Sequence, residues 1–337
     1  MRAIWTGLLA AFASMGAAQA ADQALIDAAK KEGVAVWYTT AIIDQFVRPA
    51  VDAFQKKYGV KVDYVRANAA EIALRVTTEA KAGKILTDLI DGTSTTVILR
   101  RDNMIEKWLP DVKLPARYID PEGYWMATNE FVLTPGYNEE LVPATIRPRA
   151  WDDLLDPRWK GKLAWNVTPS SSSGQGFVGL VMMERGEQKA REFFAKLSKQ
   201  NVTGLKVSAR QVLDLVIAGE YSIGLEIFNN QAIISRNRGA PVNWIAMDPA
   251  LAVLSVMSLP RGAPHPNAGK LLFDFIVSPE GQKIMRDSGE LPVDPDQPPL
   301  DPGLRPGPTT FRALYLTPEQ LDAGLPGWTK VYNEYFQ

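Results

Sequence analysis

The feature that most constrains the fold of this chain is an alternation of strand-like and helix-like segments, which occurs in two series. The strand-like segments are short, apolar and rich in β-branched or aromatic residues, whereas the helix-like segments carry apolar residues at helical spacing. This alternation is typical of βαβ units, whose strands form a mostly parallel sheet flanked by helices. The first series has strands at 34–40, 60–65 and 86–92 and helices at 24–33, 46–59, 69–83 and 95–105. The second has strands at 162–167 and 221–228 and helices at 176–185, 187–200, 209–220 and 229–239.

Extended segments near 128–136 and 248–259 connect the two series, so we expect an α/β fold with two lobes. In open α/β sheets, ligands bind beyond the carboxyl ends of the strands, and two facing lobes therefore predict a shared ligand cleft. Later in the chain we expect a helix at 267–289, an irregular Pro-rich segment at 291–308 and a short helix after 317–324. The predicted boundaries are 21–130 for lobe 1, 131–249 for lobe 2, 250–298 for a return to lobe 1, and 299–337 for a C-terminal segment packing mainly on lobe 2.

The first twenty residues have the pattern of a secretory signal peptide. Arg2 supplies a positive charge, residues 3–13 form an apolar core, and Ala18-Gln19-Ala20 is a small-x-small cleavage site. The apolar run is short for a membrane span, which takes roughly 20 residues. We therefore expect cleavage after Ala20 and a periplasmic protein that is not inserted in the membrane.

The composition excludes several classes of function. Lys+Arg number 37 and Asp+Glu 38, so no overall basic field would attract nucleic acid. Cysteine is absent, and His265 is the one histidine, so thiol chemistry, zinc sites and Ser-His-Asp catalysis lack their residues. We expect His265 to be structural, and Asp152, Asp153 and Asp156 to cap and form ion pairs rather than bind metal. No enzymatic activity, cofactor or metal is predicted.

A run of four serines within 168–176 is the most distinctive local sequence. It lies between the strand at 162–167 and a helix that we expect to start near Gly174. Hydroxyls and free backbone N–H groups at a helix N-terminus favour an anion. The alternative interpretation is a helix cap with spare, solvated serines.

Hydroxyl, amide and cationic side chains recur at strand ends in both series and form the predicted ligand-binding set. For four of them an alternative stays open. Trp125 could stack on a ligand or fill the hinge, and Glu226 could bind an amine or face away. Arg66 and Arg210 could bind an anion or remain solvated surface charges. The complete predicted set is Thr39, Thr40, Arg66, Thr93, Ser94, Thr95, Trp125, Ser171, Ser172, Ser173, Gly174, Ser208, Arg210, Glu226, Asn229 and Asn230.

Several motifs in this order resemble the periplasmic solute-binding proteins of ABC importers, specifically the type II, ferric-ion-binding-like branch. They are ALIDAAKKEGVAVWYTT, VDAFQKKYGVKVDYVRA, EAKAGKILTDLI, YNEELVP, WDDLLDPRWKGKLAW, IAGEYSIGL and APHPNAGKLLFDFIVSPEGQ. The resemblance covers nearly all of the chain after the signal peptide. It implies a monomeric receptor whose two lobes close on a small solute and which then docks on membrane permease subunits.

The chain departs from this family at its metal site. The family's iron-binding members carry two adjacent tyrosines where this chain has Phe228-Asn229-Asn230, and a histidine or acid where it has Thr39-Thr40-Ala41. Hydroxyls and amides do not supply the anionic oxygens that ferric ion prefers. We therefore expect a small anionic or zwitterionic organic solute with a carboxylate, phosphate or phosphonate head group. Alternatives are a sensor that docks to a membrane histidine kinase and a ferric receptor with non-tyrosine ligands.

Overall fold

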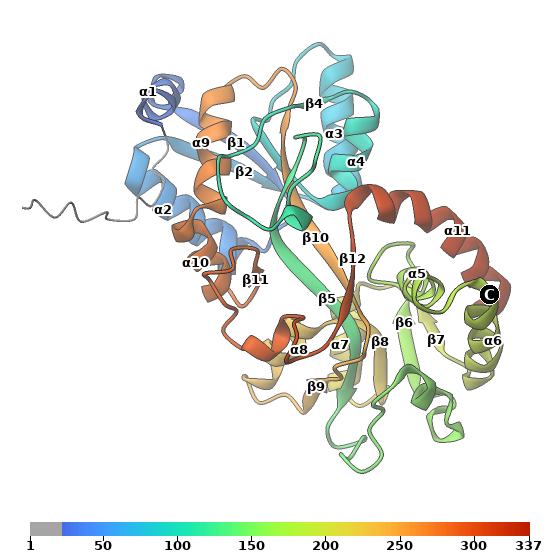
Figure 1. Ribbon diagram of the computed structural model, residues 1–337. Helices are drawn as coiled ribbons and strands as arrows, with labels where there is room; N and C mark the ends of the chain where they lie inside the picture. Colours follow the sequence, from blue (N-terminus) through green and yellow to red (C-terminus); the bar gives the residue numbers. More distant parts are fainter. Residues whose placement is uncertain (1–21) are drawn as a thin grey trace, which may run out of the picture.

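The computed structural model describes residues 22–337, so the expected signal peptide lies outside the described residues. The chain forms two α/β lobes, one above the other in Figure 1, joined by two long strands. The main path of the sheet has the order β2-β1-β3-β10-β5-β8-β6-β7, and the remaining short strands pair with β5 or β10. No helix within 22–337 combines the length and the apolar character needed to cross a membrane.

Lobe 1 is built from the N-terminal series and a later return of the chain. Strand β1 pairs in parallel with β2 and β3, whereas β3 pairs antiparallel with β10. Trp37, Phe54 and Phe275 belong to the core on one face of this sheet, and Ile72 and Leu99 belong to the core on the other. The elements are α1 (Gln23–Glu32), β1 (Val34–Thr39), α2 (Arg48–Tyr58), β2 (Lys61–Arg66), α3 (Ala69–Lys81), β3 (Leu89–Asp91), α4 (Thr93–Arg101), β4 (Ile105–Glu106), α9 (Pro266–Val277), α10 (Pro279–Asp287) and β11 (Leu291–Pro292).

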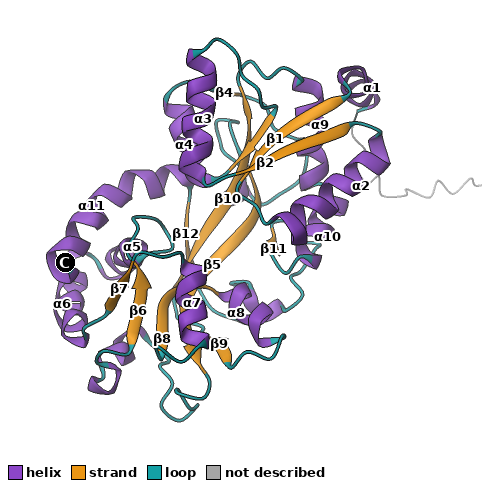
Figure 2. Cartoon of the chain, turned by 180° about the vertical axis from the view of Figure 1, so that it is seen from behind, coloured by secondary structure: helices purple, strands orange, loops and turns teal. Residues whose placement is uncertain are grey.

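Strands β5 (Met126–Asn138) and β10 (Ala250–Pro260) run antiparallel to each other and pass through both lobes (Figures 1 and 2). They correspond to the two extended connections expected from the sequence. Because β10 pairs antiparallel with β3 and β5 pairs antiparallel with β8, the sheet is mixed rather than purely parallel. Their register shifts between Ser255 and Val256, beside the gap between the lobes.

Lobe 2 repeats the α/β pattern on the other end of these two strands. Its strand β6 pairs in parallel with β7 and β8. Trp165, Phe177 and Phe193 lie in the core on one face, and Val212 and Ala232 lie in the core on the other. The elements are β6 (Leu163–Asn166), α5 (Gly174–Arg185), α6 (Glu187–Leu197), β7 (Thr203–Leu205), α7 (Ala209–Ile217), β8 (Ile223–Phe228), α8 (Asn229–Arg236) and β9 (Val242–Trp244).

The helix expected at 267–289 is in fact two helices, α9 and α10, separated at Ser278. Pro279 has no N–H to continue the helical hydrogen bonds, and proline disfavours helical geometry in the residue before it. The Ser278 hydroxyl then caps α10 by accepting a hydrogen bond from the Gly281 backbone N–H at 3.3 Å. The expectation of one continuous helix was therefore wrong.

The C-terminal helix α11 (Pro318–Phe336) is longer than the short helix expected, and it follows β12 (Ala313–Leu316). Figure 1 shows it passing from α4 of lobe 1 to α5 and α6 of lobe 2. At its start, Glu319 accepts hydrogen bonds from the Arg100 guanidinium at 2.6 Å and from the Trp125 indole at 2.8 Å. Toward its end, Tyr332 packs on Trp165 of lobe 2 with ring centroids 5.5 Å apart. The helix thus contacts both lobes.

Candidate ligand-binding cleft

A cavity of about 250 Å³ lies between the lobes, where β5 and β10 pass from one lobe to the other. Residues from lobe 1, from the crossing strands and from lobe 2 contribute to its walls. Thr40 follows β1, Arg66 ends β2 and Asp91 ends β3, so the lobe 1 strands direct their carboxyl ends to this cavity, as the sequence predicted. The lining residues are Trp37, Thr40, Ala41, Ile42, Gln45, Phe46, Arg66, Asp91, Thr128, Asn129, Phe131, Phe228, Gln231, Ser255, Met257, Met285, Ser288 and Glu290.

At one end of the cavity, the buried carboxylate of Asp91 holds the turn that follows β1. Its Oδ1 accepts hydrogen bonds from the Thr40 backbone N–H at 2.7 Å and from the Thr40 hydroxyl at 2.6 Å. Its Oδ2 accepts a hydrogen bond from the Trp37 indole at 2.9 Å. Burial raises the pKa of Asp91, and these hydrogen bonds oppose that rise. Asp91 therefore positions Thr40 with most of its own acceptor capacity already used.

Arg66 brings a cation to the same part of the cavity. It pairs with Thr39 in the parallel register of β1 and β2, which places it beside the turn at Thr40. Its side chain is exposed, and within residues 22–337 it forms no salt bridge. An exposed guanidinium without a carboxylate partner is free to bind an anion that enters the cleft.

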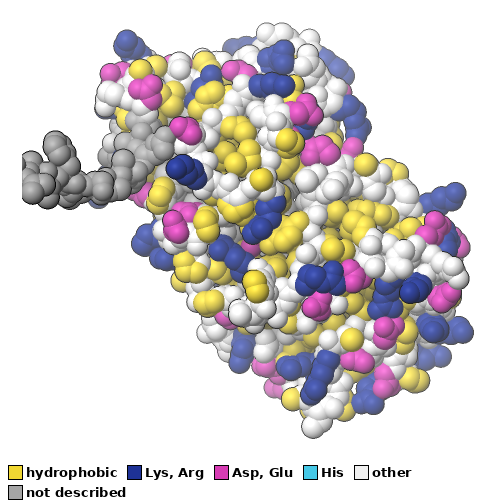
Figure 3. All heavy atoms as spheres, in the orientation of Figure 1, with side chains coloured by type: hydrophobic (Ala, Val, Ile, Leu, Met, Phe, Trp, Pro, Cys, Tyr) yellow, Lys and Arg dark blue, Asp and Glu magenta, His cyan; other side chains and the backbone are white. Residues whose placement is uncertain are grey.

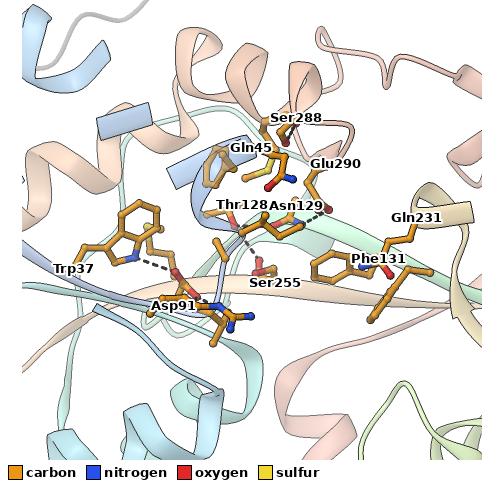
Figure 4. Close-up of a pocket in the computed structure, with 18 residues that line it drawn as sticks. Trp37, Gln45, Asp91, Thr128, Asn129, Phe131, Gln231, Ser255, Ser288 and Glu290 are labelled. Atoms are coloured by element: carbon orange, nitrogen blue, oxygen red, sulfur yellow. Dashed lines mark hydrogen bonds between the residues drawn. The ribbon is translucent and has the colours of Figure 1, made fainter. Parts of the chain in front are cut away.

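Glu290 lies at the other end of the cavity, as Figure 4 shows. Its side chain is buried, and its Oε2 accepts long hydrogen bonds from the amides of Asn129 at 3.4 Å and Asn230 at 3.3 Å. Burial raises the pKa of Glu290 to about 7, because these two bonds compensate little of the lost hydration. The cavity therefore has a second carboxyl group, and this one is weakly satisfied.

Aromatic rings and small polar groups line the cavity between these two ends. Phe131 and Phe228 contact each other with ring centroids 5.0 Å apart, and both line the cavity. Thr128, Asn129 and Ser255 lie between Asp91 and Glu290 in Figure 4. An apolar wall with a few convergent polar groups is the usual composition of a small-molecule site.

Two of the predicted residues, Thr40 and Arg66, line this cavity. Four lobe 1 residues on the predicted list are engaged elsewhere or face solvent. The Thr39 hydroxyl accepts a hydrogen bond from the Ala41 backbone N–H at 3.0 Å, and the Thr95 hydroxyl donates to the Ala69 carbonyl at 2.9 Å. The Thr93 hydroxyl donates a hydrogen bond to the Leu254 carbonyl, and Ser94 is exposed.

Trp125 lies just before β5 and does not line the cavity. It is buried in a cluster with Leu254 and Val256, and its indole donates to Glu319 of α11. His265 is held in its loop, because its backbone N–H donates to Asp88 Oδ1 at 2.6 Å and its ring Nδ1 lies 3.0 Å from Asp88 Oδ2.

The serine run forms a compact turn rather than a loose linker. The Ser173 hydroxyl donates to the Ser170 carbonyl at 2.7 Å and accepts from the Ser170 backbone N–H at 3.1 Å. A Cβ at Gly176 would lie 1.8 Å from the Ser171 carbonyl oxygen, so the turn closes tightly on the first turn of α5. The helix begins at Gly174, as predicted. Ser171 and Ser172 are half-buried, and none of Ser171, Ser172, Ser173 and Gly174 lines the cavity described above.

The other predicted residues of lobe 2 do not line the cavity. Ser208 caps α7, and Arg210 forms an ion pair with Asp214 at 2.7 Å. The Asn229 amide donates to the Leu304 carbonyl at 2.8 Å, whereas the Asn230 amide donates to Glu290 Oε2 at 3.3 Å. Both carboxylate oxygens of Glu226 are buried without a hydrogen-bond partner, and burial raises its pKa well above its usual range. Direct contact with a ligand remains a prediction for the whole set.

Sequence reasoning did not select Glu290, Asn129 or Gln231, which line the cavity. Asn129 lies inside an extended strand and Glu290 follows α10, so neither occupies the end of a strand in a βα unit. Gln231 lies only one residue beyond the predicted Asn229 and Asn230, on the same helix α8. Within residues 22–337, no group of three or more histidine, cysteine or acidic side chains is placed to hold a metal ion.

Comparisons with known proteins agree with this architecture. A periplasmic protein of Salmonella typhi, whose name gives 2-aminoethylphosphonate as its expected ligand, is 27% identical over 289 residues, which are 83% of this chain and 81% of the relative. Iron-bound HitA from Pseudomonas aeruginosa superimposes with a TM-score of 0.72 at 20% identity, covering 88% of this chain and 99% of HitA. AfuA from Actinobacillus pleuropneumoniae with bound fructose-6-phosphate superimposes with a TM-score of 0.69 at 19% identity, covering 90% of this chain and 98% of AfuA.

The family model for bacterial extracellular solute-binding proteins matches residues 95–312. This span includes most of lobe 2, both crossing strands and the helices α9 and α10 that return to lobe 1. The chain therefore belongs to the bacterial extracellular solute-binding proteins and has the two-lobed fold of type II periplasmic binding proteins.

Proposed function

We propose that this protein is the periplasmic receptor of an ABC importer for a small anionic or zwitterionic organic solute, which it delivers to membrane permease subunits. The observation that carries the proposal is the cavity between the lobes, whose wall contains Thr40 and an exposed Arg66 that forms no salt bridge within residues 22–337. A phosphonate, phosphate or carboxylate placed there would gain charge-assisted hydrogen bonds from the guanidinium.

The similar proteins support an anionic head group. The Salmonella relative is named for 2-aminoethylphosphonate, and the AfuA structure contains fructose-6-phosphate. Both molecules carry a phosphorus oxyanion on a small organic group, which is the chemistry that the Arg66 guanidinium suits. The Thr40 hydroxyl already donates its proton to Asp91.

We further propose that lobe closure completes the site. In the present arrangement, lobe 2 contributes Phe228 and Gln231 to the cavity lining besides Phe131 on β5. The turn at 170–173 and the first turn of α5 lie at the carboxyl end of β6, and closure would bring their donors toward the solute. Signal-peptide cleavage after Ala20, the lobe boundaries given above and a monomeric state are parts of the same proposal.

A ferric receptor is the less favoured alternative. Phe228, Asn229 and Asn230 offer no phenolate oxygen, and the two cavity carboxyl groups lie at opposite ends (Figure 4). Ferric ion prefers several anionic oxygens around one centre. We therefore expect no coloured tyrosinate–iron complex when ferric citrate is added to the protein.

The proposal is tested by a thermal-shift screen of the mature protein against phosphonates, phosphate esters, carboxylates, amines and metal ions. A solute present at a hundred times its dissociation constant should raise the unfolding free energy by about 2.7 kcal/mol. Failure of every anion and zwitterion to raise the melting temperature, or tight stoichiometric binding of ferric ion, would refute the proposed solute class.

A variant pair assigns the binding to the cleft. Arg66→Ala should weaken binding of the solute from the screen at least tenfold, since a hydrogen bond to a charged group is worth about 1.5–3 kcal/mol. Arg149→Ala is the matched control, because Arg149 is an exposed arginine outside the cavity lining. The control should bind like the wild type, and equal binding by Arg66→Ala would remove Arg66 from the site.

A further inference from the structure

The two carboxyl groups of the cavity differ in how well the protein satisfies them. Asp91 accepts three hydrogen bonds of 2.6–2.9 Å, shared between both of its oxygens. Glu290 accepts two of 3.3–3.4 Å, both on Oε2. Within residues 22–337, no Lys or Arg forms a salt bridge with Glu290. This end of the cavity therefore lacks a positively charged donor. Burying a carboxylate without a cation is costly, so a cationic ligand group would be favoured there.

A second acceptor without a donor lies at the same end. The side-chain oxygen of Gln231 is buried and accepts no hydrogen bond within residues 22–337, and Gln231 lines the cavity together with Glu290. Figure 4 shows the two side chains at the end of the cavity away from Trp37 and Asp91. The amide groups of Asn129 and Asn230 already donate to Glu290, so they do not supply the missing hydrogen bonds. Within residues 22–337, both of these acceptors therefore have capacity for further donors.

The wall beside these acceptors suits a cation. Phe131 and Phe228 form a tilted aromatic pair at the cavity, with an interplanar angle of 54°. The face of an aromatic ring attracts an ammonium group electrostatically, and the attraction is stronger when the cation is desolvated.

We propose that the cleft contains a subsite for a protonated primary amine, formed by Glu290, Gln231 and the pair of Phe131 and Phe228. This inference rests on the proposed function, since it describes one end of the same solute. An ammonium group supplies three donors and a positive charge, which are the two things that this end lacks. With Arg66 near the opposite end, the cavity selects a zwitterion whose amine and anion are separated by a short chain.

The subsite makes a specific statement about selectivity. An analogue in which a methyl group replaces the ammonium has nearly the same shape, but it would leave Glu290 and Gln231 unpaired in a closed cleft. A site built around hydrogen bonds to a substrate group strongly rejects the analogue without that group. The amine should therefore contribute to affinity beyond what the anion contributes.

The test uses three matched ligand pairs in which only this group changes: 2-aminoethylphosphonate and propylphosphonate, taurine and propane-1-sulfonate, and β-alanine and butanoate. Calorimetry should show that the amine of the best-bound pair binds the wild-type protein at least tenfold more tightly than its methyl analogue. Glu290→Gln should reduce the affinity for that amine at least tenfold and leave the affinity for the methyl analogue unchanged. Glu220→Gln, an exposed Glu→Gln change outside the cavity lining, is the control and should bind both ligands like the wild type.

The outcomes separate the subsite from the function on which it rests. Equal affinities of the wild type for amine and methyl analogue, or an unchanged preference in Glu290→Gln, would overturn the amine subsite and leave an anion receptor standing. Absence of binding by all six ligands to the wild type would overturn the amine subsite, whereas the proposed function falls only if every anion and zwitterion in the screen also fails to bind. The comparison within the wild type needs no variant, so it stands even if Glu290→Gln folds poorly.

Discussion

At the scale of single residues, the buried carboxyl groups are the most informative positions. Their sequence neighbours gave no sign of their role: Glu290 follows a helix and precedes a Pro-rich segment, and only the fold brings Asn129 and Asn230 to it. Arg66 and Thr40, by contrast, could be predicted because both stand at strand ends, where the topology of an α/β sheet places ligands. Contacts made between distant segments are the part that the sequence did not reveal.

The pKa of Glu290 predicts a pH dependence of the unliganded protein. Its pKa in the folded protein is raised to about 7 from 4.5, so the folded state binds a proton that the unfolded state has released. The stabilisation is fully present below pH 4.5 and is lost as the pH rises through 7. Glu290→Gln, which cannot ionise, should therefore gain stability relative to the wild type over this window, by about 3 kcal/mol at pH 8.

This difference is measured by urea unfolding of both proteins between pH 4.5 and 8 without ligand. Comparing the two proteins removes the contributions of the other titrating groups, which they share. A gap between their unfolding free energies that does not change with pH would contradict the assignment.

At the scale of elements, most helices and strands were predictable because their boundaries have local chemical causes. Gly33 and Gly59 end α1 and α2 in the left-handed conformation, and both were identified as helix ends from the sequence. The break at Ser278-Pro279 had an equally local signal, but the apolar spacing on both sides concealed it. The length of α11 had no such signal, because a proline such as Pro326 usually ends a helix. In the structure the helix continues beyond Pro326, where its residues pack in the core of lobe 2.

The turn at 170–173 allows a sharper test than replacement of every serine. The Ser173 hydroxyl is engaged by the Ser170 backbone, whereas the Ser172 hydroxyl has a long contact of 3.5 Å with Ser170 Oγ and the Ser171 hydroxyl has no hydrogen bond within residues 22–337, so Ser171 and Ser172 can turn their hydroxyls to a solute. Ser171→Ala with Ser172→Ala should weaken binding of the best ligand at least tenfold, at about 1.5–3 kcal/mol for each lost hydrogen bond to a charged group. The melting temperature without ligand should fall only slightly. Calorimetry that finds unchanged affinity would leave the run as a helix cap.

The contact between α5 and α11 predicts the stability effect of one glycine. A Cβ at Gly179 would lie 2.5–2.7 Å from three ring atoms of Trp328, so the indole would have to move. Gly179→Ala should lower the unfolding free energy by about 1–3 kcal/mol through overpacking. Gly327→Ala in α11 is the control, because a Cβ there meets nothing within 4 Å. Its melting temperature should stay equal or rise slightly, since alanine favours helices; equal losses in both variants would contradict this packing argument.

At the scale of the whole molecule, the two-lobed arrangement could be predicted because the extended segments between the two series were evident in the sequence. The contact of α11 with lobe 1 could not, since it depends on Arg100 and Glu319, which are far apart along the chain. Because α11 contacts both lobes, a change in the angle between the lobes must also change the position of α11 relative to at least one of them.

Lobe closure can be followed directly because the chain has no cysteine of its own. Leu74 on α3 of lobe 1 and Met183 on α5 of lobe 2 are exposed, so Leu74→Cys with Met183→Cys would carry one spin label on each lobe. The distance distribution between the labels should shift when the ligand from the screen is added. The same labelled protein with Arg66→Ala should need at least tenfold more ligand for that shift. A distribution that ligand leaves unchanged at saturation would contradict closure.

The position of α11 also has a consequence for how the chain matures. Trp328 and Tyr332 belong to the core of lobe 2 and pack on Gly179 and Trp165, which lie much earlier in the chain. The ribosome synthesises the chain from its N-terminus, so the core of lobe 2 lacks these two rings until α11 has been made. Lobe 1 waits as well, because α9 supplies Phe273 and Phe275 to its core. Neither lobe can therefore reach its final packing from its first strands and helices alone, and each completes its core only when a later segment of the chain joins it.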